Sequence, residues 1–89
     1  MTLNFPNRNR SFEPRQDRVR FWGHDDALEI TFFLEGATLR NLCPGLGADE
    51  ADILRAFDST ISWIHQIARQ AYERNRSRSN TLILTESSL

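Results

Sequence analysis

Apolar residues recur at steps of three and four along the segment Asp49–Arg76, which is the spacing of one face of an α-helix. The apolar positions are Ile53, Leu54, Phe57, Ile61, Ile64, Ile67, Ala68, Ala71 and Tyr72. Asp49 stands where an N-cap side chain accepts the backbone N–H groups left free at a helix start. Ser59-Thr60 is the weak point, because both residues favour caps over helix interiors. Since the apolar face continues without a phase shift, the pattern predicts one long helix with a bend at that point.

Two runs ahead of this helix, Val19–Trp22 and Leu28–Leu34, alternate between apolar and other residues in the manner of β-strands. The quartet Gly23–Asp26 between them is rich in turn-forming residues, so the two runs are predicted to form a β-hairpin. Alternation assigns one face of the hairpin to the core: Val19, Phe21, Leu28, Ile30, Phe32 and Leu34. The opposite face then carries Arg20, Trp22, Glu29, Thr31, Phe33 and Glu35.

Shorter segments complete the chain. At the N-terminal end, Leu3–Phe5 is predicted as a short edge strand stopped by Pro6, and Asn7–Asp17 as a polar loop. Gly36–Cys43 is predicted as a short helix, ended by Pro44–Gly47. A polar exit at Asn75–Asn80 leads to a final strand, Thr81–Thr85, and Glu86–Leu89 is expected to fray. Leu82 and Leu84 face inward in this strand unless the register places Ile83 there instead.

The predicted order of elements is β-β-β-α-α-β, which defines an α+β protein. A small, mainly antiparallel sheet would carry one short and one long helix packed on one face. The 89 residues are expected to form a single domain, residues 1–89, with one modest core. The pattern does not determine where Thr81–Thr85 docks in the sheet.

The net charge and the cysteine content limit the classes of function that this protein can have. A net charge of −1 provides no global field for nucleic acid or anionic membranes. Cys43 is the only cysteine, so the chain has no internal disulfide and no site built from several thiols. The N-terminal residues lack the basic and apolar regions of a signal peptide, and no apolar run reaches the ~20 residues of a membrane span. A cytoplasmic protein without a membrane partner is expected.

Residues with catalytic or metal-binding chemistry are present but are not assembled into a recognisable set. His24-Asp25-Asp26 lies in the predicted hairpin turn. These residues could serve as a general base or as part of a metal site, and the alternative is a solvated turn without a chemical role. His65 falls near the edge of the apolar helix face. Cys43 falls at a helix C-terminus, where the helix dipole disfavours a thiolate. We therefore predict no catalytic, cofactor-binding or metal-binding residue.

Aromatic and basic residues provide the strongest binding signals. Trp22 and Phe33 face away from the predicted core, and Trp63 lies off the centre of the apolar helix stripe. Together with Arg20 they define a predicted interaction surface, because exposed apolar patches mark interfaces. Two arginine clusters provide an alternative, contacts to phosphates: Arg8, Arg10, Arg15 and Arg18 near the N-terminus, and Arg76 and Arg78 near the C-terminus.

Several segments resemble a small bacterial family, domain of unknown function 1488. The matching features are Leu3-Asn4-Phe5-Pro6, Val19-Arg20-Phe21-Trp22-Gly23, and Ala56-Phe57-Asp58 followed by Ile64, Ala68 and Tyr72. The resemblance spans nearly the whole chain and implies a compact α+β domain, but no activity. The family tends to end in an Asp-Phe pair where this chain has Ser88-Leu89, so no role of that terminus carries over.

These observations favour a small, non-enzymatic interaction or regulatory protein whose partner is either another protein or a second copy in a homodimer. The alternative is a nucleic-acid-binding accessory protein that uses the arginine clusters, which requires both clusters to share one face. A third hypothesis is a small enzyme or metal protein around His24, Asp25 and Asp26. It requires His65 to lie close enough to His24 to share a metal.

Overall fold

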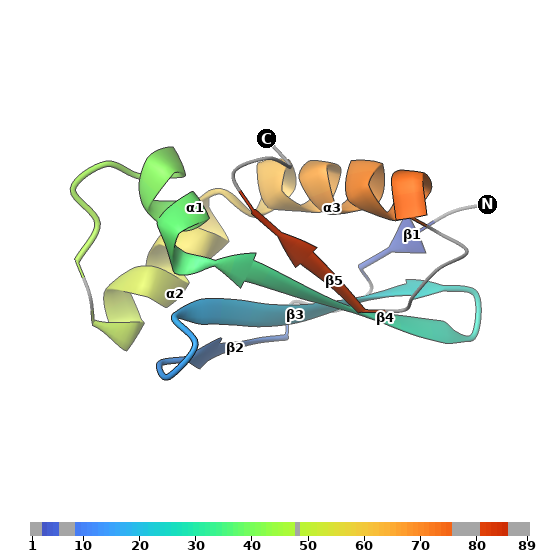
Figure 1. The fold of residues 1–89 in the computed structure, drawn as a ribbon, viewed down its shortest axis with the longest axis horizontal. Coiled ribbons are helices and arrows are strands. Elements are labelled where there is room, and N and C mark those ends of the chain that lie inside the picture. Colours follow the sequence, from blue (N-terminus) through green and yellow to red (C-terminus); the bar gives the residue numbers. More distant parts are fainter. Residues whose placement is uncertain (1–2, 6–8, 48, 76–80, 86–89) are drawn as a thin grey trace.

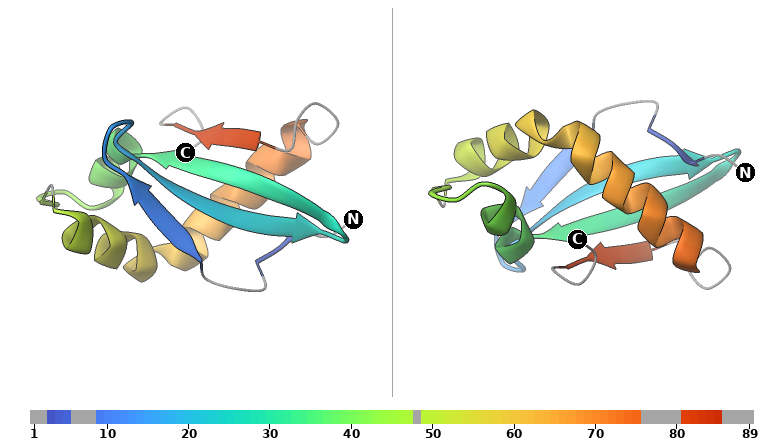
Figure 2. Two further views of the ribbon diagram at one scale, coloured as in Figure 1. Left: turned by 90° about the horizontal axis from the view of Figure 1, so that it is seen from below. Right: turned by 90° about the horizontal axis from the view of Figure 1, so that it is seen from above.

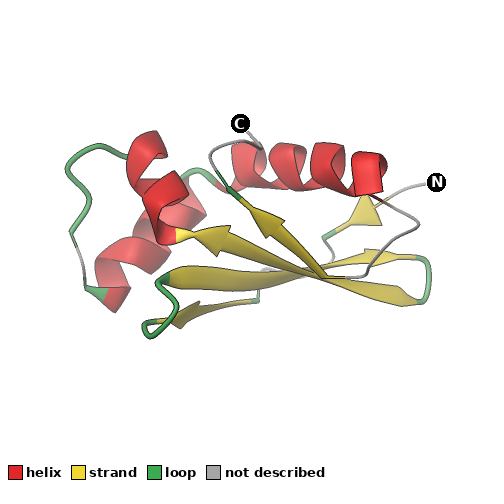
Figure 3. Ribbon diagram, viewed as in Figure 1, coloured by secondary structure: helices red, strands yellow, loops and turns green. Residues whose placement is uncertain are grey.

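The computed structural model describes residues 3–5, 9–47, 49–75 and 81–85. The strands of this part of the chain are β1 Leu3–Asn4, β2 Arg10–Glu13, β3 Arg18–Asp25, β4 Leu28–Glu35 and β5 Thr81–Leu84. Its helices are α1 Gly36–Leu42, α2 Glu50–Ser59 and α3 Ile61–Asn75. The helices lie on one side of the sheet (Figure 1, Figure 3). The predicted α+β class is therefore confirmed.

The sheet has the strand order β1-β3-β4-β5, and β2 pairs with the same side of β3 as β1 does. All pairs are antiparallel except β4–β5, which is parallel. The predicted hairpin is confirmed but longer than expected, since β3 runs through Gly23 and His24 to Asp25. Only Asp26 and Ala27 connect it to β4, and Asp26 adopts the left-handed backbone conformation (φ 55°).

The prediction of a loop over Asn7–Asp17 is wrong for Arg10–Glu13, which forms β2. This strand pairs antiparallel with β3, and Phe12 lies opposite Val19. A turn follows at residues 14–17, where the Asp17 N–H donates to the Pro14 carbonyl at 3.3 Å. Phe12 is the only apolar residue in the strand, so its periodicity is too weak to identify it. Pairing with β3 stabilises the strand instead, and this is information that the local sequence does not contain.

The prediction of one long helix is wrong, because the segment is divided at Thr60 into α2 and α3. Thr60 has a non-helical backbone (φ −113°, ψ 16°). The Ser59 and Thr60 hydroxyls both donate to the Ala56 carbonyl, at 2.9 and 2.8 Å, and such bonds compete with the helical ladder. The two helices run in different directions across the sheet (Figure 2). Asp49 is the N-cap residue as predicted, but its carboxylate makes no capping hydrogen bond.

The core lies between the sheet and the helices. Phe21 and Phe32 stack with ring centroids 5.2 Å apart, and Phe57 of α2 meets Phe21 edge-on at the same separation. The predicted inward positions of the helices are buried or partly buried, including fully buried Ile64 and Ala68. Leu28 departs from its predicted core position because it starts β4 at the hairpin end, where it is 49% exposed.

Strand β5 has the first of the two predicted registers, in which Leu82 and Leu84 face inward. Leu82 and Leu84 are buried beneath the helices, whereas Ile83 is 54% exposed on the opposite face. Leu82 lies opposite Phe32, and Leu84 lies opposite Leu34 in the parallel pairing with β4. The polar exit at Asn75–Asn80, apart from Asn75 itself, and the predicted frayed end at Glu86–Leu89 lie outside the described residues.

An ion pair joins the β2–β3 turn to α1. Both Arg40 terminal nitrogens donate to the Asp17 carboxylate, at 2.8 and 3.1 Å. The Gly36 N–H donates to the Asp17 carbonyl at 2.7 Å, and a Cβ at Gly36 would overlap the Asp17 carboxylate. Asp17 itself has a left-handed backbone (φ 52°). The hydrogen bond from Arg40 lowers the pKa of the Asp17 carboxyl below its ordinary value.

This lowered pKa predicts a specific dependence of stability on pH. A carboxyl with a depressed folded-state pKa stabilises the fold above its unfolded pKa and loses that contribution as the pH falls through the folded value. The variant Asp17→Asn should therefore show a shallower loss of stability than the wild type below the ordinary aspartate pKa of 3.8. Urea unfolding at a series of acidic pH values measures the difference.

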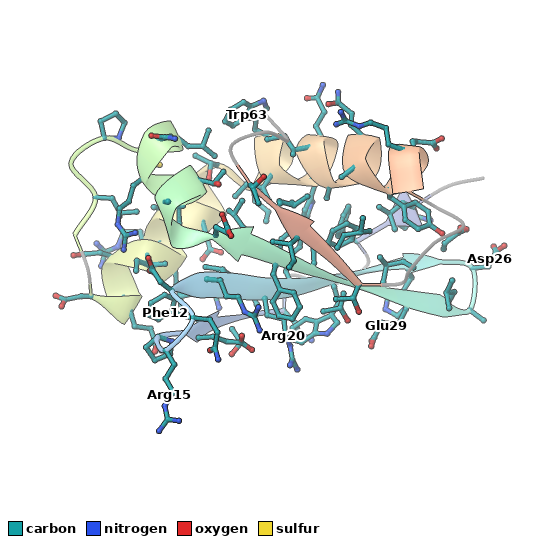
Figure 4. The ribbon with its side chains drawn as sticks, viewed as in Figure 1. Phe12, Arg15, Arg20, Asp26, Glu29 and Trp63 are labelled. Carbon is teal, nitrogen blue, oxygen red and sulfur yellow. The ribbon has the colours of Figure 1, made fainter. Side chains whose placement is uncertain are left out.

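Asp26→Asn is the matched control, because Asp26 also has a left-handed backbone but lies at the exposed hairpin end (Figure 4). Both substitutions remove one carboxylate, so the difference between their stability profiles in acid isolates the Asp17–Arg40 ion pair. Parallel profiles for wild type and Asp17→Asn would show that the ion pair contributes no pH-dependent stability.

Candidate interaction surface

The sheet face opposite the helices is the surface on which the predicted interaction residues gather. No described helix or strand covers it (Figure 2). Alternation along the strands places Arg18, Arg20 and Trp22 of β3 and Phe33 of β4 on this face. Glu13 of β2 and Ile83 of β5 extend it to either side. These six residues are called the open face below.

The register of the strands arranges the open face in rows. Arg20 lies directly opposite Phe33, which in turn lies opposite Ile83 across the parallel β4–β5 pair. Trp22 lies opposite Thr31, one row along. The aromatic rings are half-buried by these neighbours, while Ile83 at the end of the row is mostly exposed.

Each open-face arginine stacks on an aromatic ring. The Arg18 guanidinium carbon lies 3.8 Å from the centroid of the Phe33 ring. The corresponding separation between Arg20 and Trp22 is 4.9 Å. Attraction between a cation and the negative face of a ring favours both arrangements. The arginines thus lie against the sheet, and their planar groups form part of a continuous aromatic surface.

Glu13 holds both arginines from the neighbouring strand. The Arg18 Nε–H donates to Glu13 Oε1 at 2.7 Å, and Arg20 Nη1 lies 3.8 Å from Glu13 Oε2. Within the described residues, these are the ion pairs that the two arginines form. Two guanidinium groups therefore share one carboxylate. Because β2 was not predicted, the sequence alone did not indicate this contact.

Trp63 does not join the other predicted surface residues. It is 43% exposed on α3, on the helix side of the molecule, whereas Arg20 lies beneath the sheet (Figure 4). The sheet and its core separate Trp63 from Trp22 and Phe33. Helix periodicity placed Trp63 off the buried stripe correctly, but it does not specify which exposed side the residue occupies relative to the strands.

The predicted phosphate contacts are similarly divided. Arg10 makes a bidentate pair with Asp58 of α2, at 2.9 and 2.8 Å, rather than joining the open face. Arg18 pairs with Glu13, and Arg15 lies exposed in the β2–β3 turn (Figure 4). The predictions for Arg8, Arg76 and Arg78 lie outside the described residues. The bidentate pair with Asp58 removes Arg10 from a shared phosphate-binding surface.

The fold also separates the residues of the hypothetical catalytic or metal site. The Tyr72 hydroxyl donates to Asp25 Oδ2 at 2.6 Å, and the His65 ring stacks on Phe5 with centroids 3.8 Å apart. His24 lies opposite Glu29, on the other side of the sheet from His65. In the described part of the chain, no three histidine, cysteine or acidic residues gather in a group that could hold a metal.

A shallow groove of about 480 Å³ lies between the α1–α2 connection and α2. Its lining includes the half-buried Cys43 and the Asp52–Arg55 ion pair, with 3.1 Å between Arg55 Nη1 and Asp52 Oδ1. Thr38 has a buried hydroxyl without a hydrogen-bond partner among the described residues, but it does not line this groove. Among the described residues that line the groove, none is a histidine that could act as a base for the thiol.

The fold and its open face define a small α+β protein with helices on one side of a five-stranded sheet and an arginine–aromatic surface on the other. Residues 3–84 match the family described as protein of unknown function (DUF1488), and the chain belongs to that family. No curated protein and no solved structure matches the chain. None of the described helices is long and apolar enough to cross a membrane.

Proposed function

We propose that this is a non-enzymatic interaction or regulatory protein that binds a partner protein through the open face. The observation that carries the proposal is the pair of arginine–aromatic stacks on a sheet face that no described helix or strand covers. Tryptophan and arginine are enriched among the residues that contribute most to protein–protein binding. In this surface their side chains are already held in place, which lowers the entropy cost of binding.

The charges of the open face indicate the chemistry of the partner. Arg18 and Arg20 share the Glu13 carboxylate, and Glu29 and Glu35 of β4 lie on the same face, with Glu35 opposite Arg18, so this face offers guanidinium groups but no net positive charge. A partner that brings a carboxylate to these guanidinium groups and apolar side chains to Trp22 and Phe33 complements both features. Arg forks pair with carboxylates in a bidentate manner, which adds directional specificity.

Quantitative capture of partners from cells that make the protein tests this proposal. Trp22→Ala and Arg20→Glu should each reduce the recovery of a specific partner by about tenfold or more, because they remove central contacts of the surface. Trp63→Ala is the matched control, since it removes an equally large, partly exposed side chain from the opposite side. Equal recovery with Trp22→Ala and with wild type would overturn the proposal.

A further inference from the structure

Strand β5 forms one edge of the sheet. Within the described residues it pairs only with β4, and no described helix or strand lies beyond it in the sheet (Figure 2). Along a strand, backbone N–H and C=O groups point alternately to the two sides. Half of the β5 backbone therefore points away from β4, toward the position that a further strand would occupy.

Natural sheet edges are kept from pairing by short strands, charges, prolines or bulges. Of these features, β5 has only its short length of four residues. The β5 sequence Thr-Leu-Ile-Leu contains neither charge nor proline, and its residues favour extended structure. The opposite edge differs, because it is divided between the two-residue β1 and β2, and β2 carries Arg10 and Glu13.

Ile83 makes the edge self-complementary. It is 54% exposed on the open-face side, and it ends the row that begins at Arg20 and passes through Phe33. A two-fold axis perpendicular to the sheet pairs residues that point to the same face. Antiparallel pairing centred on Ile83 places the two Ile83 side chains beside each other and sets Leu82 opposite Leu84 of the second copy. The apolar rows of both copies then join, and no like charges meet at the axis.

We propose that the protein forms a homodimer through antiparallel pairing of two β5 strands, with the two-fold axis at Ile83. The dimer has one continuous sheet, and both open faces lie on the same side of it. The dimer does not depend on the proposed partner binding, because it is formed by the backbone edge of β5 and, of the open face, involves only Ile83. If the open face binds a partner as proposed, the dimer presents two such sites to it, which raises the apparent affinity for a bivalent partner.

Charge reversal at the axis provides a sharp test. Sedimentation of the wild type should give a mass twice that of the 10.3 kDa protomer. Ile83→Lys and Ile83→Glu should each give the protomer mass, because like charges then face each other across the axis. Mixing the two variants should restore the dimer as a heterodimer. Leu28→Lys, which also replaces an exposed aliphatic residue, should remain dimeric.

Several outcomes would overturn the proposal of a dimer. A monomeric wild type does so directly, and so does a dimer that survives Ile83→Lys. If the lysine variant fails to fold, amide hydrogen exchange of the wild type decides instead. Exchange of the β5 amides should slow as protein concentration rises, and exchange independent of concentration would contradict edge pairing. Trp22→Ala should leave the dimer intact, which separates failure of this inference from failure of the open-face proposal.

Discussion

Replacing Phe32 by alanine is expected to reduce the free energy of unfolding by about 3–5 kcal/mol, whereas Phe33→Ala should cost only about 1 kcal/mol. Phe32 is fully buried and stacks on Phe21, so truncation leaves a cavity in the core. Its neighbour Phe33 points to the open face and mainly loses its contact with Arg18. A domain of this size has about 5–15 kcal/mol of stability, so the first change removes a large share of it.

Urea unfolding with matched m-values measures both changes on one scale. The two residues are adjacent in β4 and have the same side chain, so propensity and composition are constant in the comparison. Equal losses for the two variants would show that Phe33 is as much a core residue as Phe32. The open face would then not be a separate surface.

Gly23→Ala is expected to destabilise the fold by about 1–3 kcal/mol through overpacking. A Cβ at this position would lie 3.0 Å from Leu3 Cδ1 and 3.0 Å from Phe5 Cε1. It would also lie 3.2 Å from the Asn4 carbonyl oxygen, which belongs to the backbone of β1. Alanine restricts the unfolded chain more than glycine does. This effect alone would stabilise the fold by about 0.4–1 kcal/mol. The predicted clash is the larger effect.

A second substitution isolates the clash. Leu3→Ala removes one of the two closest side-chain atoms, so the double variant should lose less stability than the sum of the single losses. Urea unfolding of the four proteins completes the cycle. A stabilising Gly23→Ala, or strictly additive losses, would show that β1 does not pack against β3 as closely as the structure indicates.

Much of the fold could be predicted from the local sequence, because the residues with the strongest apolar periodicity are also the residues buried in the core. In β4, Ile30, Phe32 and Leu34 alternate with polar or aromatic residues, and all three are fully buried. The helix stripe through Phe57 and Ile64 is equally regular, and both residues lie in the core. Such patterns reflect which face meets the core, so they predict both the element and its orientation.

The errors occur where tertiary pairing or side-chain hydrogen bonds override the local pattern. Strand β2 has one apolar residue, Phe12, and forms because the edge of β3 pairs with it. The division of the long helix at Thr60 leaves the apolar stripe intact, so periodicity cannot detect it. The hydroxyl bonds to Ala56 are the local signal, and Ser59-Thr60 marked that position in the sequence.

The open face could be predicted only where it depends on alternation within the hairpin. Alternation in the hairpin places Arg20, Trp22 and Phe33 on one face, as the structure does. It does not reveal Glu13, which reaches Arg18 from an unpredicted strand. It also cannot relate a helix residue such as Trp63 to the strands, because their relative position depends on connections between elements.

Site-specific photocrosslinking in cells that make the protein is the most direct test of the open face as a protein-binding surface. A photoreactive aromatic residue at Trp22 should form a covalent adduct with a partner protein, and nuclease treatment should leave that adduct unchanged. The same residue at Trp63, on the opposite side, should form the adduct weakly or not at all. Absence of an adduct at Trp22, equal adducts at both positions, or an adduct with nucleic acid would contradict the account.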